Sequence, residues 1–251
     1  MSEPVVTACV LIIGNEILSG RTQDTNLQHL ARTLNEWGIR VTHARVIPDV
    51  ADTIVSTLNE VRRAFDYVFT TGGIGPTHDD ITADCVAAAF DVPLVEHPEI
   101  AARIRTRDAP PHIMAARLRM ARVPRGAGLI ENATGGPQGF YIENVFVMAG
   151  IPIVMQNMVS TLAGKLRAGK PVRSRSVTVY LGESTIAAPL TEIQNRYVHI
   201  DLGSYPFARD NRFGTTLVMR GTDYDGLDRM LEDVNAMIVA LGAVPEDVKA
   251  E

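Results

Sequence analysis

Residues 66–82 read DYVFTTGGIGPTHDDIT, and this stretch decides the fold prediction. Its beginning, 66–71, is rich in aromatic and β-branched residues, which predicts a buried strand. Glycines at positions 72, 73 and 75 follow at once. Glycine permits positive φ angles and lets another group come close to the backbone. Residues 78–90 then have the pattern of a helix, so the segment is predicted to run from strand through glycine turn to helix.

Strands and helices alternate on both sides of this segment. Near-continuous apolar strands joined by helices indicate a parallel sheet with helices packed against it. Asp24 is a plausible N-cap of the first long helix, which Gly38 is expected to end. The predicted strands are 5–13, 39–47, 66–71 and 145–148; helices are expected between 24 and 38, around 54–61, over 78–90, over 99–122 with a break at the prolines 110 and 111, and over 152–166.

The pattern of predicted strands and helices changes after residues 167–174, a short basic and polar stretch that is typical of a linker. The part beyond it is predicted to be a small α+β unit, with strands over 176–181, 198–203 and 214–221 and helices over 185–197 and 225–241. We therefore predict two domains, 1–168 and 174–251.

The composition excludes some classes of partner. The chain has 251 residues, 46% of them hydrophobic, and a formal net charge of −5. That charge argues against a broad nucleic-acid or anionic-membrane surface. The sequence has no run of the ~20 apolar residues that a membrane span needs and no signal-peptide pattern at its start. Cys9 and Cys85 are expected to be buried thiols, and we predict a cytoplasmic protein.

The glycine turn is a candidate site for an anion. Ligands of open α/β sheets bind beyond the carboxyl ends of the strands, and a helix N-terminus there offers free N–H groups to a phosphate. The turn lacks the lysine of a P-loop and the third glycine of a dinucleotide fingerprint. The residues expected to hold the anion are Thr71, Gly72, Gly73, Gly75 and Thr77.

Two adjacent acids follow the turn, Asp79 and Asp80. Carboxylates beside a phosphate repel it unless a divalent cation bridges the two. The alternative is that these aspartates only cap the helix. Further polar residues are expected at the same edge of the sheet: Glu16, Asp24, Asn26 and Asp49. By spacing alone each fits a cap or a turn better than a ligand, and only their shared placement favours a binding role.

Several motifs in order resemble a known family. GNEILSG (14–20), DTN (24–26), PD (48–49) and TTGGIGPTHDDIT (70–82) look like the CinA N-terminal domain, of the molybdopterin-binding family that includes MoaB, MogA and a domain of MoeA. GESTIA (182–187) and GSYPF (203–207) resemble the small domain that follows in CinA and in eukaryotic FAD synthases. The deamidase domain of full-length CinA has no counterpart here, so we expect no deamidase activity.

The resemblance implies a three-layer α/β/α main domain, with Asp80 and Asp49 as the functional acids. It also implies metal-dependent cleavage of the pyrophosphate of an ADP-ribose-like or FAD-like nucleotide, with Mg²⁺, Mn²⁺ or Co²⁺, in a homo-oligomer. The expected metal ligands are Asp79, Asp80 and Glu16. The full set of expected ligand-binding residues is Thr71, Gly72, Gly73, Gly75, Thr77, Asp79, Thr82, Asn26, Gly135, Gly139, Ser204 and Tyr205.

The sequence departs from the family pattern where a glutamate is usual, because Val154 stands there. Valine neither binds metal nor transfers a proton. Three functions therefore stay open: a metal-dependent nucleotide pyrophosphatase, a protein that binds or adenylylates molybdopterin, and a nucleotide-binding module without turnover.

Overall fold

The computed structural model describes residues 5–209 and 211–250. The chain forms two compact units, and the boundary between them in the sequence lies between Gly169 and Lys170. The predicted domain ranges also include residues 1–4, 210 and 251, which lie outside the described residues.

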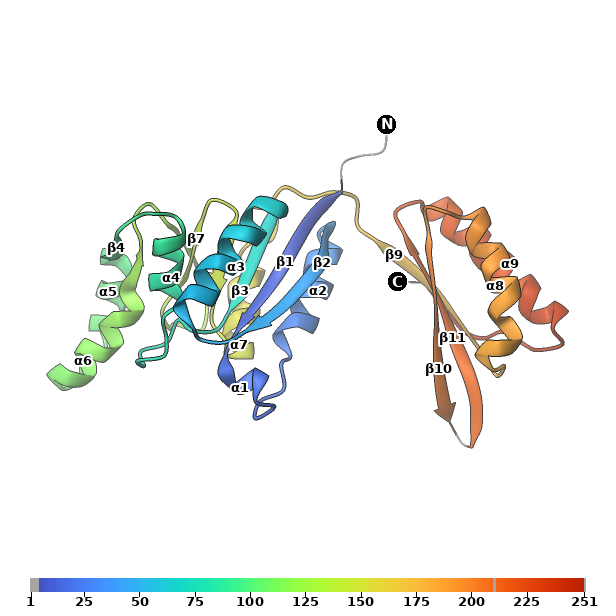
Figure 1. The fold of residues 1–251 in the computed structure, drawn as a ribbon, viewed down its shortest axis with the longest axis horizontal. Helices are drawn as coiled ribbons and strands as arrows, with labels where there is room; N and C mark the ends of the chain where they lie inside the picture. The colour runs from blue at the N-terminus through green and yellow to red at the C-terminus, as the bar shows by residue number, and fades with distance from the viewer. Residues whose placement is uncertain (1–4, 210, 251) are drawn as a thin grey trace. The chain divides into compact units, whose positions relative to one another are not determined.

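The first unit is built on a six-stranded sheet with the order β2-β1-β3-β8-β7-β6 (Figure 1). Four strands are parallel, and two antiparallel strands, β7 and β6, extend the sheet beyond β8. The bounds are β1 Val6–Ile13, β2 Ile39–Ile47, β3 Tyr67–Thr71, β8 Val145–Met148, β7 Gly139–Ile142 and β6 Gly128–Ile130.

Helices cover both faces of this sheet. Alternate residues of β1 show why: Leu11 and its neighbours on one face pack into one buried cluster, and Val10 and its neighbours on the other face pack into a second cluster. The first cluster contains residues of α3 (Ala51–Ala64), α4 (Thr82–Ala89) and α5 (Pro98–Arg105); the second contains residues of α2 (Asn26–Glu36) and α7 (Pro152–Ser160). The predicted three-layer α/β/α fold is confirmed.

Smaller elements complete the first unit: α1 (Asn15–Leu18), α6 (Pro111–Leu118), a 3-10 helix at Arg119–Ala121, and a two-stranded ribbon of β4 (Leu94–Glu96) and β5 (Arg122–Pro124). Two expected helices are shorter than predicted. The one expected at 78–90 begins only at Thr82, because residues 77–80 form a turn. The one expected at 152–166 ends at Ser160, and Gly164 adopts a φ of 70° beyond it.

The second unit is a four-stranded antiparallel sheet of order β10-β11-β9-β12, packed against α8 (Glu183–Arg196) and α9 (Tyr224–Ala240). Its strands are β9 Arg173–Val179, β10 Asp201–Arg209, β11 Arg212–Gly221 and β12 Glu246–Ala250. The bounds expected for the strand at 198–203 are wrong, since β10 begins at Asp201 and continues to Arg209 by pairing with β11. Pro206 fits within it because β10 is an edge strand. None of the helices within residues 5–209 and 211–250 is long and apolar enough to span a lipid bilayer.

Candidate functional site

The glycine turn leaves β3 at the carboxyl edge of the parallel strands, and its backbone requires glycine. Gly72 has a φ of 101° and Gly73 a φ of 67°, in the region that side chains disfavour. A Cβ on Gly72 would lie 2.1 Å from the carbonyl oxygen of Ile13, and a Cβ on Gly73 would lie 2.1 Å from Thr82 Oγ1. These two glycines are therefore needed by the fold itself, whether or not a ligand binds.

Thr82 fastens the turn to the following helix. Its hydroxyl donates to the carbonyl oxygen of Gly72 at 3.0 Å, and its backbone N–H donates to the carbonyl oxygen of Gly73 at 3.0 Å. The residue is fully buried. Both donors of Thr82 are thus occupied within the protein, and the structure places this expected ligand-binding residue behind the turn.

Asp79 and Asp80 converge on Thr77. The Thr77 hydroxyl lies 2.6 Å from Asp79 Oδ1 and 2.5 Å from Asp80 Oδ2, and the Thr77 backbone N–H donates to Asp80 Oδ2 at 2.8 Å. One hydroxyl proton cannot serve both carboxylates fully, so the two acids share it. Gly75 lies against the same carboxylate, because a Cβ there would come within 2.6 Å of Asp80 Oδ2.

The environment of Asp79 favours its charged form. The hydrogen bond from the Thr77 hydroxyl, then the backbone N–H of Asp79 itself, and then the charges of His78 and Arg119 hold the pKa of Asp79 below its usual range. The side chain remains exposed. Asp79 is therefore a carboxylate at neutral pH and open to solvent, where a cation can reach it.

The expected metal ligands do not form a complete protein site. Within the described residues, no group of three or more histidine, cysteine, aspartate or glutamate side chains is arranged to hold a metal ion. Mg²⁺, however, commonly takes only one or two carboxylates and completes its coordination with water and substrate phosphates. The pair of Asp79 and Asp80 fits that donor chemistry, whereas a site made by the protein alone does not fit.

Glu16 lies instead at a small cavity of about 60 Å³ near the ends of β1 and β3. Thr71, Gly72 and Asn26 also line this cavity, and Asp79 and Asp80 do not. Asn26 Nδ2 donates to the carbonyl oxygen of Gly150 at 2.8 Å, and its buried Oδ1 has no hydrogen-bond partner among the described residues. Glu16 and Asn26 thus share this cavity with the start of the glycine turn, whereas the two aspartates do not line it.

Asp49 and Asp24 both accept hydrogen bonds from helix N-termini. Asp49 Oδ2 accepts from the backbone N–H of Asn15, the first residue of α1, at 2.8 Å. Asp24 Oδ1 accepts from the backbone N–H of Leu27 at 2.9 Å, in the first turn of α2. Both residues have the capping role that their positions allowed, and for Asp49 that role occupies one of its carboxylate oxygens.

The remaining expected residues belong to other elements of the chain. Gly139 is buried in β7, where a Cβ would meet the carbonyl oxygen of Val147 at 2.5 Å. The carbonyl oxygen of Gly135 accepts from Arg107 at 3.2 Å. Ser204 and Tyr205 belong to β10 of the second unit, where the Ser204 hydroxyl donates to Glu183 at 2.7 Å.

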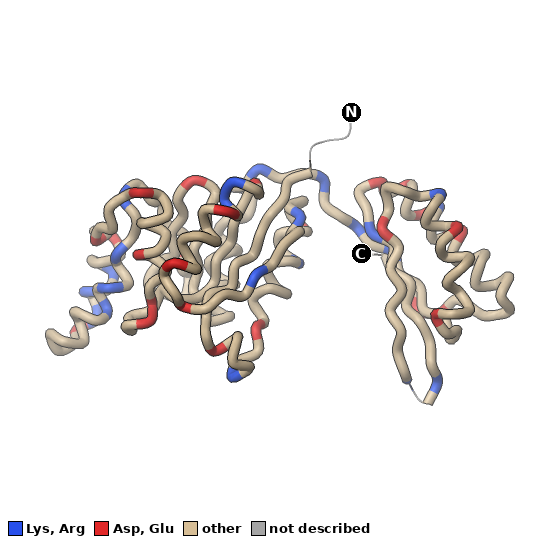
Figure 2. Tube along the Cα trace, viewed as in Figure 1, with Lys and Arg blue, Asp and Glu red and all other residues tan. Residues whose placement is uncertain are grey.

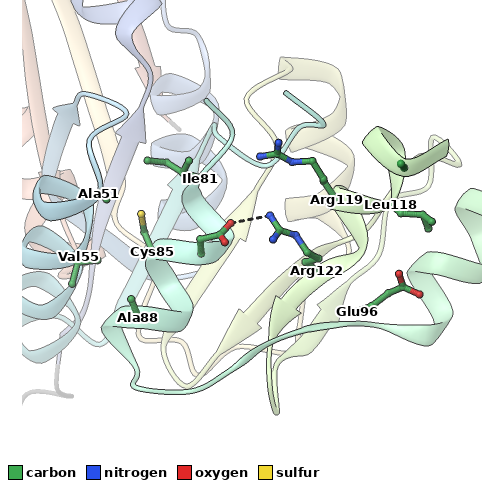
Figure 3. Close-up of a pocket in the computed structure, with 11 residues that line it drawn as sticks. Ala51, Val55, Ile81, Cys85, Ala88, Glu96, Leu118, Arg119 and Arg122 are labelled. Atoms are coloured by element: carbon green, nitrogen blue, oxygen red, sulfur yellow. Dashed lines mark hydrogen bonds and ion pairs between the residues drawn. The ribbon is translucent and has the colours of Figure 1, made fainter. Parts of the chain in front are cut away.

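A second hollow, which we call the α4 groove, was not predicted from the sequence. It has a volume of about 820 Å³ and lies along α4, with α3 on one side and residues 115–122 on the other (Figure 3). Its lining residues are Ala51, Val55, Ile81, Asp84, Cys85, Ala88, Glu96, Ala115, Leu118, Arg119 and Arg122. The volume falls within the 300–1,000 Å³ that is typical of small-molecule sites.

One signal in the sequence points to this groove. Residues 98–125 contain seven arginines and only two acids, Glu99 and Asp108, although the whole chain has a net charge of −5. Figure 2 shows these basic residues along the α5–α6 part of the first unit. Only Arg119 and Arg122 of these arginines line the groove, together with Asp84 and Glu96. The groove lining itself therefore has no net formal charge.

A parallel-dominated sheet between helical layers, with a glycine turn and two acids beyond its third strand, defines an α/β protein of the class that binds small ligands at that edge. Comparison with known families specifies the class. Residues 9–168 match the family described as "probable molybdopterin binding domain", and residues 171–247 match "FAD synthase, middle domain". The chain belongs to this molybdopterin-binding domain family, and CinA-like proteins are among its relatives.

Individual relatives agree with this assignment. A protein of Archaeoglobus fulgidus is 30% identical over 197 residues, which are 78% of this chain and 84% of the relative. A CinA-like protein of Citrifermentans bemidjiense is 37% identical over 175 residues, but the match covers 64% of this chain and only 41% of that protein. The solved structure of CinA from Thermoplasma acidophilum, whose function is described as unknown, is 29% identical with a TM-score of 0.58 and covers 63% of this chain and 96% of that one.

Proposed function

We propose that the first unit binds a pyrophosphate-containing nucleotide at the glycine turn and hydrolyses the pyrophosphate with the help of a divalent metal ion. The observation that carries the proposal is the convergence of Asp79 and Asp80 on the Thr77 hydroxyl, directly beyond β3. The match of residues 171–247 to a domain of FAD synthase supports a nucleotide as the ligand.

The turn itself would position the phosphates. Gly72 and Gly73 carry no side chain that could keep a phosphate away from the backbone, and residues 74–77 precede the N-terminus of α4. Two carboxylates at this place would repel the ligand unless a cation neutralised them. Asp79 and Asp80 would hold that cation together with phosphate oxygens of the ligand.

The metal ion, Mg²⁺, Mn²⁺ or Co²⁺, would supply charge neutralisation and a more acidic water molecule for attack on phosphorus. Asp80 is the residue that we expect to orient this water. The Thr77 hydroxyl and N–H already fix the orientation of one Asp80 oxygen, which leaves the other oxygen free for such a contact. Asp49 would act indirectly, by fixing the start of α1 through Asn15.

The test is an assay of the purified chain with ADP-ribose and with FAD, in the presence of Mg²⁺, Mn²⁺ or Co²⁺, with AMP measured by chromatography. We expect AMP release that Asp80→Asn reduces at least 100-fold. Asp52→Asn, which removes an exposed acid in the first turn of α3, serves as the matched control and should keep full activity. AMP release that is equal in Asp80→Asn and in the parent chain would contradict the proposal.

A second candidate is nucleotide or pterin binding without turnover, and Val154 favours it. This residue lies in α7 and packs partly buried against the α2–α7 side of the sheet, so an apolar side chain replaces an ionisable one at this position. Binding of ADP-ribose or molybdopterin by calorimetry, with no AMP released under any of the three metal ions, would support this candidate. Light scattering of the same sample tests the expected homo-oligomer.

A further inference from the structure

The α4 groove lies next to the proposed phosphate site. Ile81, which lines the groove, directly follows Asp80 in the chain. On the opposite wall, Arg119 extends toward α4 (Figure 3). The groove therefore begins where the acids of the glycine turn end.

The groove has an apolar floor. Val55 of α3, Ile81 at the N-terminus of α4 and Leu118 at the end of α6 are half-buried, whereas Ala51 and Ala88 are exposed within it. Because these side chains are small or branched and the groove has a volume of about 820 Å³, it has room for a flat ring system. Figure 3 shows Ala51 and Val55 on one side of α4, with Arg119 and Arg122 extending toward it from the other.

Arg119 and Arg122 both have a buried Nε without a hydrogen-bond partner among the described residues, but they differ in their ion pairs. Arg122 Nη2 donates to Asp84 Oδ2 at 3.1 Å and so is already paired with an acid. Arg119 has no carboxylate within ion-pair distance among the described residues, and its Nε is buried without a hydrogen-bond partner. A buried donor without a partner is costly, and a guanidinium is well suited to bind two phosphate oxygens at once. Arg119 is thus the cation of the groove that is free to take an anion.

We propose that the α4 groove binds the organic part of the ligand, a heteroaromatic group joined to the diphosphate, and that Arg119 binds the diphosphate where the groove meets the glycine turn. This inference rests on the proposed function, because it takes the phosphates to lie at the turn. Arg119 would then offset the repulsion that Asp79 exerts on the bound phosphates. The groove would select ligands that carry a ring over inorganic pyrophosphate.

The experiment compares the affinities of ADP-ribose, used as its non-hydrolysable α,β-methylene analogue, and of inorganic pyrophosphate. Both are measured by calorimetry with Mg²⁺ present, for the full chain and its variants. Arg119→Gln should lower the affinity for both ligands at least 10-fold. Arg117→Gln removes the same charge from the same segment, but Arg117 donates to the carbonyl oxygen of Arg107 and does not line the groove. This control should change either affinity less than 2-fold.

A second pair of variants tests the groove itself. Ala88→Trp places a large ring on the exposed floor of the groove, whereas Ala102→Trp places one on an exposed position of α5 outside it. Ala88→Trp should lower the affinity for ADP-ribose at least 10-fold and leave the affinity for pyrophosphate unchanged. Ala102→Trp should change neither affinity. Thermal unfolding of each variant shows that it is folded.

The outcomes separate this inference from the proposed function. A parent chain that binds neither compound overturns both. If Arg119→Gln and Ala88→Trp bind ADP-ribose as tightly as the parent chain does, the proposed function stands and the groove is not a subsite for the ligand. Retained binding in Ala88→Trp together with a changed oligomeric state assigns the groove to a contact between copies of the chain and also overturns the inference.

Discussion

The hydroxyl of Thr82 donates a hydrogen bond to the carbonyl oxygen of Gly72, 3.0 Å away, and so joins the first turn of α4 to the end of β3. Because the Thr82 side chain is fully buried, no water replaces this bond if it is lost. The bond holds the turn on which Thr77, Asp79 and Asp80 meet.

Replacing Thr82 by valine keeps the shape of the side chain but leaves the carbonyl oxygen of Gly72 without its donor. We expect the free energy of unfolding to fall by about 1–3 kcal/mol, since a buried acceptor is left unsatisfied. Urea unfolding measures this change. Thr82→Ser keeps the hydroxyl and serves as the control. A serine variant that loses as much unfolding free energy as the valine variant would contradict the role assigned to this hydroxyl.

Gly72→Ala should be more damaging than a glycine substitution at a similar φ elsewhere. Alanine at Gly72 would be strained at a φ of 101° and would also clash with the carbonyl oxygen of Ile13. Gly20, with a φ of 72° and no atom within 4 Å of a built Cβ, provides the control. We expect a loss of about 1 kcal/mol for Gly20→Ala and clearly more for Gly72→Ala. Equal losses of stability in Gly72→Ala and Gly20→Ala, measured by thermal unfolding, would show that the clash with Ile13 costs no free energy.

Asp66 should contribute stability that depends on pH. The backbone N–H of Thr7 first, then the Thr7 hydroxyl and Arg167, hold the pKa of Asp66 below its usual range. A carboxyl whose pKa is lowered by folding stabilises the fold above its unfolded pKa of about 3.9, and that contribution is lost as the pH falls through the lower folded pKa.

The test of Asp66 is a comparison with Asp66→Asn at several pH values. At pH 7 the asparagine variant should be less stable by about 1 kcal/mol, because a neutral amide accepts the same hydrogen bonds more weakly. Below pH 3 the difference in unfolding free energy should shrink, since the parent side chain becomes neutral too. A difference that stays constant from pH 7 to pH 2.5 would rule out the ionised carboxylate as its source.

Cys85 lines the α4 groove but should react slowly. Burial, and then the negative charge of Asp84, raises the pKa of the Cys85 thiol to about 11. Because only the thiolate is alkylated, labelling with iodoacetamide at pH 8 should be at least 10-fold slower than in urea-unfolded chain, where the pKa is about 8.5. Mass spectrometry of the Cys85 peptide measures the rate. Fast labelling of the native protein would mean that this wall of the groove opens.

The sequence determined those parts of the molecule that depend on local pattern. The strands 39–47 and 145–148 were predicted to the residue, because each is a run of β-prone residues with a clear stop at either end. The position of the glycine turn followed from residues 72–75 in the same way. Asp24 was expected to be the N-cap of a helix; the N-cap is Thr25, one residue later, but the Asp24 carboxylate does accept the N–H of Leu27 in the first turn.

The tertiary structure decided what depends on pairing. The short strands β4, β5, β6 and β7 were not predicted, and they exist because a neighbouring strand pairs with each of them. The α4 groove draws Ala51, Ile81 and Arg119 together from three separate segments. Sequence spacing could place Glu16 and Asp79 at one edge of the sheet, but only the folded chain shows that Glu16 lines a small cavity whose lining does not include Asp79.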